Sequence, residues 1–149
     1  MKRVCIVLFV LFTLMAGWRF AQAQSESTPP AATVRQLMLD LIYPASNDLL
    51  LHIYRGGPRG EGDWAAVRRD AVTLEESGNL LMMPGRARDQ EDWAAHVKML
   101  VNAGTAAYKA AVDKNAQALA AVAAPLDAAC TTCHQEYRPN VYPPRGGAK

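Results

Sequence analysis

Residues 33–54 read TVRQLMLDLIYPASNDLLLHIY and have the pattern of an amphipathic helix. Thr33 and Gln36 stand three residues apart, which is the spacing of a capping box at a helix start. Residues at helical spacing then predict one stripe that packs on a core: Val34, Met38, Leu41, Ala45, Leu49 and His52. Because Pro44 has no backbone N–H, we expect a kink near it.

Three further helices are predicted after the glycine-rich loop at residues 56–62. Each begins at a residue type that caps helices: Asp63, Asp89 and Asn115. Prolines and a glycine end or bend these helices: Pro84, Gly85, Pro125 and Pro139. The inner faces hold apolar or small residues at helical spacing: Trp64, Val67, Ala71, Leu74 and Leu81; Trp93, Val97, Leu100, Val101, Gly104 and Tyr108; Leu119, Val122, Leu126, Cys130 and Cys133. Four such helices without strand-like alternation predict an all-α, antiparallel, up-down-up-down four-helix bundle.

The first 23 residues have the layout of a secretory signal peptide. Lys2 and Arg3 precede an apolar run of 14 residues at 4–17, and Ala21-Gln22-Ala23 matches an A-x-A cleavage site. The run is shorter than the roughly 20 residues that span a bilayer. We therefore expect cleavage after Ala23, export to the periplasm and no stable membrane insertion. Residues 24–149 then form one domain.

The charge of the mature chain is nearly balanced. Cleavage after Ala23 removes three of the 16 basic residues and none of the 14 acidic ones, which leaves a formal net charge of −1. Nucleic-acid binding favours a basic face or stripe, and the sequence has no such cluster. Cys5 leaves with the signal, so the mature chain keeps Cys130 and Cys133 and has no cysteine for a structural disulfide.

Residues 130–134 read CTTCH, the C-x-x-C-H pattern that attaches a c-type haem. On a helix, Cys130, Cys133 and His134 leave one face, so both thiols can bond the porphyrin while the imidazole binds iron. A structural zinc site needs four ligands, and a thioredoxin-like motif needs a βαβ context. The chain offers neither a second cysteine pair nor a strand pattern. We therefore predict one covalently attached haem c with His134 as the proximal iron ligand.

The predicted topology also suggests a second iron ligand. The first and last helices run antiparallel, so the start of the first lies beside His134. Met38 lies on the core stripe there, and a thioether is a known sixth ligand in c-type cytochromes, so we predict Met38 as the distal ligand. The alternative is that Met38 only fills the core. His52 lies about 21 Å farther along the helix and is excluded, and His96 is expected at the surface or rim.

Three more side chains are assigned to the haem pocket with less specific arguments. Trp93 is expected to pack on the porphyrin or seal the pocket, with its indole N–H turned to a partner or to solvent. Arg138 and Arg35 are positive groups suited to the haem propionates, and the alternative for each is a solvated arginine.

Residues 130–138 read CTTCHQEYR at the end of the last helix, which resembles the C-x-x-C-H-x-x-Y-R ending of the cytochrome c′ family. Arg35-Gln36 resembles the Arg-Gln pair that contacts the haem in many members. The resemblance implies a four-helix bundle, an exported monohaem protein that is often a homodimer, and His134 as proximal ligand. The distal residue of the family usually follows the arginine by four positions, which selects Leu39, whereas Leu37-Met38 resembles the Leu-Met of low-spin, methionine-ligated members.

These predictions support two main functions. The first is a periplasmic electron carrier, not an enzyme, in which His134 and Met38 ligate the iron and redox proteins are the partners. The second is a gas-binding protein in which Leu39, or a Met38 that does not bind iron, leaves the distal side open for nitric oxide or carbon monoxide. A third interpretation is a small haem-bearing partner of a larger redox enzyme.

Overall fold

The computed structural model describes residues 29–89 and 91–142, and in these ranges every regular element is a helix. The elements are α2 (Val34–Leu37), the π-helical turn η1 (Met38–Ile42), α3 (Tyr43–Tyr54), α4 (Glu61–Leu81), α5 (Asp92–Val112), α6 (Ala116–Ala120) and α7 (Ala123–Tyr137). The predicted all-α fold is therefore confirmed. The predicted signal peptide, the cleavage site after Ala23 and residues 143–149 lie outside the described residues.

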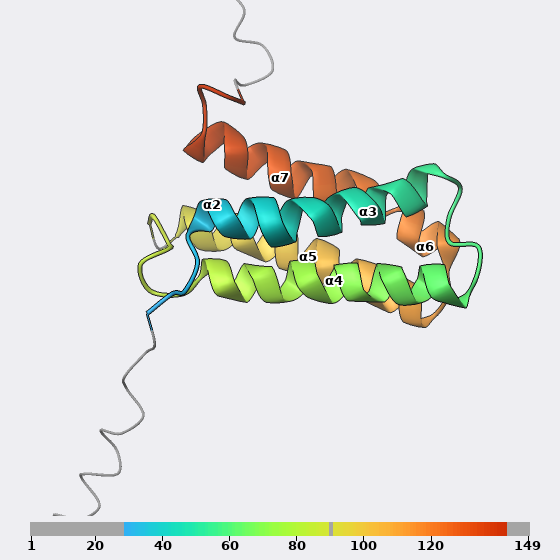
Figure 1. The fold of residues 1–149 in the computed structure, drawn as a ribbon. Helices are drawn as coiled ribbons and strands as arrows, with labels where there is room; N and C mark the ends of the chain where they lie inside the picture. The colour runs from blue at the N-terminus through green and yellow to red at the C-terminus, as the bar shows by residue number, and fades with distance from the viewer. Residues whose placement is uncertain (1–28, 90, 143–149) are drawn as a thin grey trace, which may run out of the picture.

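Consecutive long helices run in opposite directions (Figure 1). The elements α2, η1 and α3 form one rod, α4 packs on both α3 and α5, and α7 packs mainly on α5. The start of α2, the end of α4, the start of α5 and the end of α7 consequently share one end of the molecule. None of the helices that the structure describes is long and apolar enough to cross a membrane.

The first rod begins as the sequence predicts. The backbone N–H of Gln36 donates to Thr33 Oγ1 at 3.2 Å, and the N–H of Thr33 donates to Gln36 Oε1 at 2.9 Å, which completes the capping box. The rod continues through Pro44 by means of the π-turn η1, in which the N–H of Tyr43 donates to the carbonyl of Met38. This wider turn immediately before Pro44 accommodates a ring that has no N–H and would clash with an α-helical carbonyl.

The π-turn changes which residues of this rod are buried. Leu37 and Ile42 are both in the core although they are five residues apart, and the stripe then continues through Ala45 and Leu49. Leu41, which the sequence pattern assigned to the core, is 37% exposed. The predicted stripe is wrong at this point because it assumes 3.6 residues per turn, whereas η1 contains one extra residue.

Small residues bring α4 and α5 close together. Ala71 of α4 lies against Gly104 of α5, and Gly78 of α4 lies against Val97 and Val101 of α5. A Cβ on Gly104 would meet the carbonyl oxygen of Ala71 at 3.0 Å, so the backbones touch here. The predicted inner face of α5 is confirmed at Trp93, Val97, Leu100 and Gly104, whereas Tyr108 is exposed and the neighbouring Ala107 is buried.

The predicted helix ends are confirmed in part. Asn115 caps α6 by accepting from the N–H of Ala118 at 2.9 Å, and a break precedes Pro125 where the bend was expected. Asp63 does not cap α4, because the helix begins two residues earlier, at Glu61. The carboxylate of Asp63 instead accepts from the N–H of Arg59 at 2.8 Å. Asp89 accepts from the N–H of Trp93 at 2.8 Å, although α5 begins only at Asp92.

Arg86 is buried in the loop that follows α4, which the sequence pattern does not predict. Its guanidinium donates to the carbonyl of Ala32 at 2.8 Å and to the carbonyl of Leu80 at 2.7 Å. Leu80 belongs to the last turn of α4, where the helix dipole favours a positive charge. Arg86 therefore joins the end of α4 to the segment that leads into α2.

Arg86→Ala is expected to lower the free energy of unfolding by about 2–3 kcal/mol, because two partly buried carbonyls lose charged donors. Urea denaturation followed by circular dichroism measures the change. Arg88→Ala removes an exposed arginine two residues away and should stay within about 0.5 kcal/mol of the wild type. Equal losses in the two variants would show that the buried contacts of Arg86 do not stabilise the fold.

Candidate haem-binding site

A cavity of about 320 Å³ opens between the first rod, α5 and α7, and its size is that of a cofactor pocket. Its lining includes six of the residues that the sequence nominated: Met38, Trp93, Cys130, Cys133, His134 and Arg138. In residues 29–89 and 91–142 no group of three or more His, Cys, Asp or Glu side chains is placed to hold a metal ion. The nominated donors form a different set, two thiols, one imidazole and one thioether, which suits a covalent haem.

The thiols of Cys130 and Cys133 are free and half-buried on the α7 wall of the cavity. Burial, together with Asp127, raises the pKa of Cys130. Burial, Glu136 and Cys130 raise the pKa of Cys133 to about 11. Both groups are therefore neutral thiols near pH 7, whereas redox-active C-x-x-C motifs have a lowered thiol pKa. The site thus differs from that of a disulfide oxidoreductase.

His134 lies on the same wall, half-buried and in contact with the segment that follows α7. Its ring packs on Tyr142 with the centroids 4.7 Å apart. Burial, with a smaller contribution from Arg138, lowers the pKa of His134. A neutral imidazole has a free lone pair, which is the form that binds a metal.

The opposite wall contains both residues that were considered for the distal position. Met38 and Leu39 lie in the π-turn and both line the cavity. Met38 is half-buried and packs against the core, whereas Leu39 is 54% exposed. Single π-turns within α-helices occur frequently at functional sites. Here the turn places two consecutive side chains beside one cavity.

Trp93 forms a rigid part of the α5 wall. Its side chain is 3% exposed, and its indole N–H donates to the carbonyl of Leu81 at 3.0 Å. The N–H thus has a partner, as expected for a buried tryptophan. The ring is free to present its apolar surface to the cavity.

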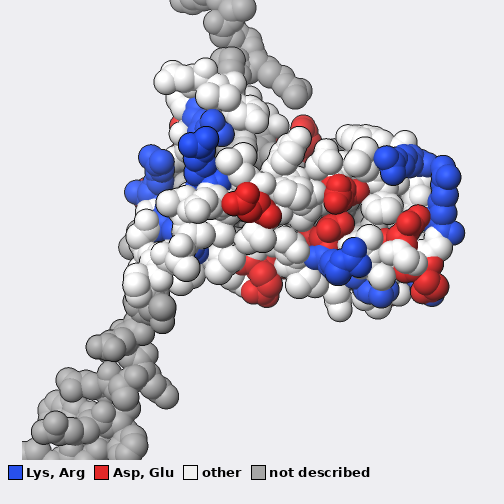
Figure 2. Space-filling view, viewed as in Figure 1, with Lys and Arg blue, Asp and Glu red and all other residues white. Residues whose placement is uncertain are grey.

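The three polar residues assigned to the pocket lie in two different places. Arg138 lines the cavity, but Arg35 and Gln36 are exposed and do not belong to its lining. Gln36 is engaged in the capping box, where its Oε1 also accepts from Thr33 Oγ1 at 2.8 Å. On the face seen in Figure 2, Lys and Arg side chains gather at the left end of the molecule and recur in its right half, where Asp and Glu side chains lie among them.

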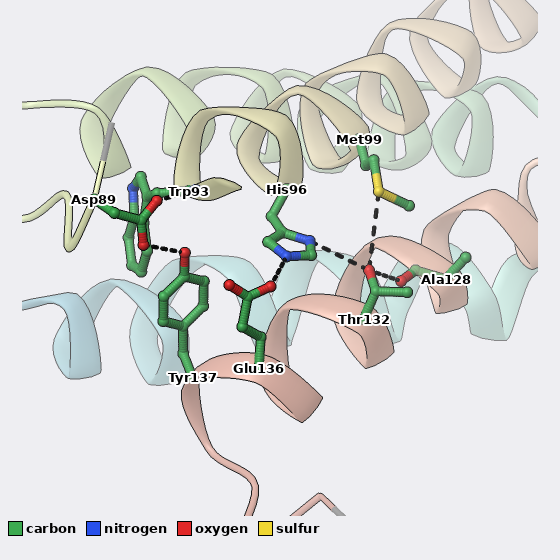
Figure 3. Close-up of polar contacts among 8 residues, drawn as sticks. All are labelled: Asp89, Trp93, His96, Met99, Ala128, Thr132, Glu136 and Tyr137. Carbon is green, nitrogen blue, oxygen red and sulfur yellow. Dashed lines mark hydrogen bonds and ion pairs between the residues drawn. The ribbon is translucent and has the colours of Figure 1, made fainter. Parts of the chain in front are cut away.

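The structure adds a polar network that the sequence argument missed (Figure 3). His96 was expected at the surface or rim, and it lies at the edge of the cavity with its side chain 14% exposed. Its Nε2 lies 2.6 Å from Glu136 Oε2, and its Nδ1 lies 3.4 Å from Thr132 Oγ1. His96 therefore joins α5 to α7.

A second contact of this network joins the end of α7 to the segment before α5. The hydroxyl of Tyr137 donates to Asp89 Oδ2 at 2.5 Å, and the Tyr137 ring packs edge-on against Trp93 with the centroids 5.0 Å apart. Hydrogen bonds from Tyr137 and from the backbone of Trp93 lower the pKa of Asp89. Burial and Asp89 raise the pKa of Tyr137. The tyrosine of the C-x-x-C-H-x-x-Y-R ending was a signal for this contact.

Asp89 should make the stability of the protein depend on pH in the acid range. Because its pKa is lowered by folding, its contribution is complete above the unfolded value of about 3.9 and is lost as the pH falls through the folded value. Asp89→Asn should therefore flatten the fall of the melting temperature below about pH 4. Tyr137→Phe removes the hydroxyl whose hydrogen bond lowers the pKa of Asp89, and it should flatten the fall in the same way. An unchanged slope in Asp89→Asn would contradict this role.

No protein-family model, curated protein or solved structure matches the chain.

Proposed function

We propose that the protein is a periplasmic electron carrier, a monohaem c-type cytochrome of the cytochrome c′ kind, and that its helices form an antiparallel up-down-up-down four-helix bundle. One observation supports this most: the same cavity is lined by Cys130, Cys133 and His134 of the C-x-x-C-H motif and by Met38. Redox proteins of the periplasm are the proposed partners. No catalytic residue is required, because the carrier forms no product.

The chain's own residues have distinct roles in this proposal. The thiols of Cys130 and Cys133 would hold the haem through two thioethers, and His134 would bind the iron through its neutral imidazole. Met38 would be the second protein ligand of the iron, and ligation by methionine and histidine favours the reduced state. When bound, the haem supplies a one-electron couple between ferric and ferrous iron.

Two other side chains would exclude water from the haem and provide a positive charge beside it. Trp93, fixed by its hydrogen bond to Leu81, would cover part of the porphyrin with apolar surface. Arg138 is exposed at the cavity and is suited to pair with a propionate. Because Arg35 lies outside the cavity lining, Arg138 is the better supported of the two arginines.

The proposal is tested on protein secreted by a host that matures c-type cytochromes. We expect the mass of the chain processed after Ala23 plus one haem, and a low-spin ferric EPR spectrum at neutral pH. A mass without haem would overturn the cytochrome assignment. A high-spin, five-coordinate spectrum would overturn the methionine ligation and with it the electron-carrier role.

Met38→Ala should convert the ferric iron from low spin to high spin, because alanine has no atom that can bind iron. The ferrous variant should then bind carbon monoxide rapidly, which absorption spectroscopy measures. Leu39→Ala is the matched control from the same turn and should keep the low-spin spectrum. If Met38→Ala leaves the spectrum unchanged, Met38 is not the ligand.

A second candidate function, gas binding, is favoured by the position of Leu39. This residue lines the same cavity and occupies the position that the family register selects. With Leu39 beside the iron, the distal side would have no protein ligand and would accept nitric oxide or carbon monoxide. Rapid, tight binding of carbon monoxide to the ferrous wild type would favour this function, and no spectral change would favour the electron carrier.

A further inference from the structure

The half of α7 that carries the motif has few apolar anchors. The buried residues of α7 are Leu126 and Ala129. From residue 130 to 137, all of which the structure describes, no residue of the helix is fully buried. Cys130 and Tyr137 pack against the core but are only partly buried, so apolar burial holds this half less firmly than the half with Leu126 and Ala129.

Polar contacts add to this restraint. His96 of α5 pairs with Glu136 at 2.6 Å, and Asp89 accepts from the hydroxyl of Tyr137 at 2.5 Å. We call these four residues the α5–α7 clasp; Figure 3 shows that its two contacts lie next to each other. The rings of His96 and Tyr137 also meet edge-on, with the centroids 5.9 Å apart.

Helix geometry connects the clasp to the motif. Residues two apart in an α-helix point about 160° away from each other, so Glu136 and His134 leave nearly opposite sides of α7. Glu136 and Thr132 are four apart and share the side that faces His96. A rotation of α7 about its axis would break these contacts and would turn His134 away from the cavity at the same time.

We propose that Asp89, His96, Glu136 and Tyr137 are positioning residues, which fix the rotation of the motif half of α7 and so direct the imidazole of His134 into the cavity. This inference rests on the proposed haem-binding function. None of the four needs to touch the iron. His96 and Glu136 hold the side of the helix that faces α5, and Tyr137 with Asp89 holds its end.

The test compares the double variant Glu136→Ala/Tyr137→Phe with Glu61→Ala. The double variant removes both contacts of the clasp but keeps the Tyr137 ring on Trp93. Glu61→Ala is the matched control, because it breaks the ion pair between Glu61 and Lys114 at the far end of the molecule. Both variants are made with haem, in a host that matures c-type cytochromes, and as the haem-free full chain.

Two measurements are made on these proteins. Amide hydrogen exchange of residues 130–137 should become about five- to tenfold faster in the double variant and stay unchanged in Glu61→Ala, since each lost hydrogen bond weakens local protection. In the haem-loaded double variant, the EPR g values should shift or broaden because the imidazole has more than one orientation. The single variant Glu136→Gln retains Tyr137 and keeps an acceptor for His96. Its EPR spectrum should be that of the wild type.

The outcomes separate this inference from the proposed function. If exchange is faster but the EPR spectrum is that of the wild type, the clasp only stabilises α7 and the positioning role is wrong. If exchange is unchanged, the clasp does not restrain α7 and the inference is also wrong. If the wild type carries no haem, the cytochrome proposal fails, while exchange in the haem-free chain still tests the restraint. Should the double variant fail to fold, Tyr137→Phe alone removes a single hydroxyl and is measured in the same way.

Discussion

The double variant Cys130→Ser/Cys133→Ser is expected to carry no covalently attached haem. A serine hydroxyl does not form the thioether that a cysteine thiol forms with a porphyrin vinyl group. Both thiols lie on the same wall of the cavity, and their loss would leave only His134 and Met38 to hold a haem. Haem staining on a denaturing gel and the intact mass of the secreted protein measure the result.

The single variants and a neighbouring substitution are the controls. Cys130→Ser and Cys133→Ser each keep one thiol and should retain haem through one thioether in reduced yield. Thr131→Ser changes a variable position of the motif and should bind haem fully. The haem-free double variant should keep wild-type helix content by circular dichroism, because serine is nearly the same size as cysteine. Covalent haem in the double variant would contradict the role of both cysteines.

Gly104→Val is expected to lower the free energy of unfolding by about 3 kcal/mol, the largest stability effect that we predict. A Cβ at this position would meet Glu75 Cγ at 2.9 Å, the carbonyl oxygen of Ala71 at 3.0 Å and the backbone N of Glu75 at 3.1 Å. Two of these atoms belong to the backbone and cannot move away by a rotamer change. The helices α4 and α5 must therefore separate, which urea denaturation of the variant measures.

Gly62→Ala is the matched control for this substitution. Gly62 lies in the first turn of α4, and a Cβ there would meet no atom within 4 Å. Alanine is the better helix former, so this variant should be unchanged or more stable by about 0.5–1 kcal/mol. A similar loss in both variants would show that the close approach at Gly104 is not the cause.

Local spacing in the sequence was sufficient for much of the fold. The capping box of Thr33 and Gln36, the cap at Asn115 and the ends near Pro84 and Pro139 depend on residues a few positions apart. The π-turn was not predictable in this way, because a periodicity argument assumes a constant number of residues per turn. Leu41 was misplaced for that reason.

The candidate site shows the same division between local and distant contacts. Cys130, Cys133 and His134 share a wall because their spacing is helical, and chain direction alone brings Met38 to the same cavity. The contact of His96 with Glu136 joins residues 40 positions apart, and that of Tyr137 with Asp89 spans 48. Such pairs depend on how α5 and α7 are rotated relative to each other. The spacing of residues along the sequence does not reveal this rotation.

The extra residue held by the π-turn lies in the part of the cavity wall that Met38 and Leu39 form. Leu37 precedes the turn, Ile42 is its last residue, and both face the core, so the turn absorbs the additional residue and leaves the helix in phase on either side. A chain that is one residue shorter between them would keep both leucine and isoleucine in the core as an ordinary α-helix. Deletion of one residue within 38–42 should thus change which side chain of this turn lines the cavity, while the rest of the helix stays in phase with the core.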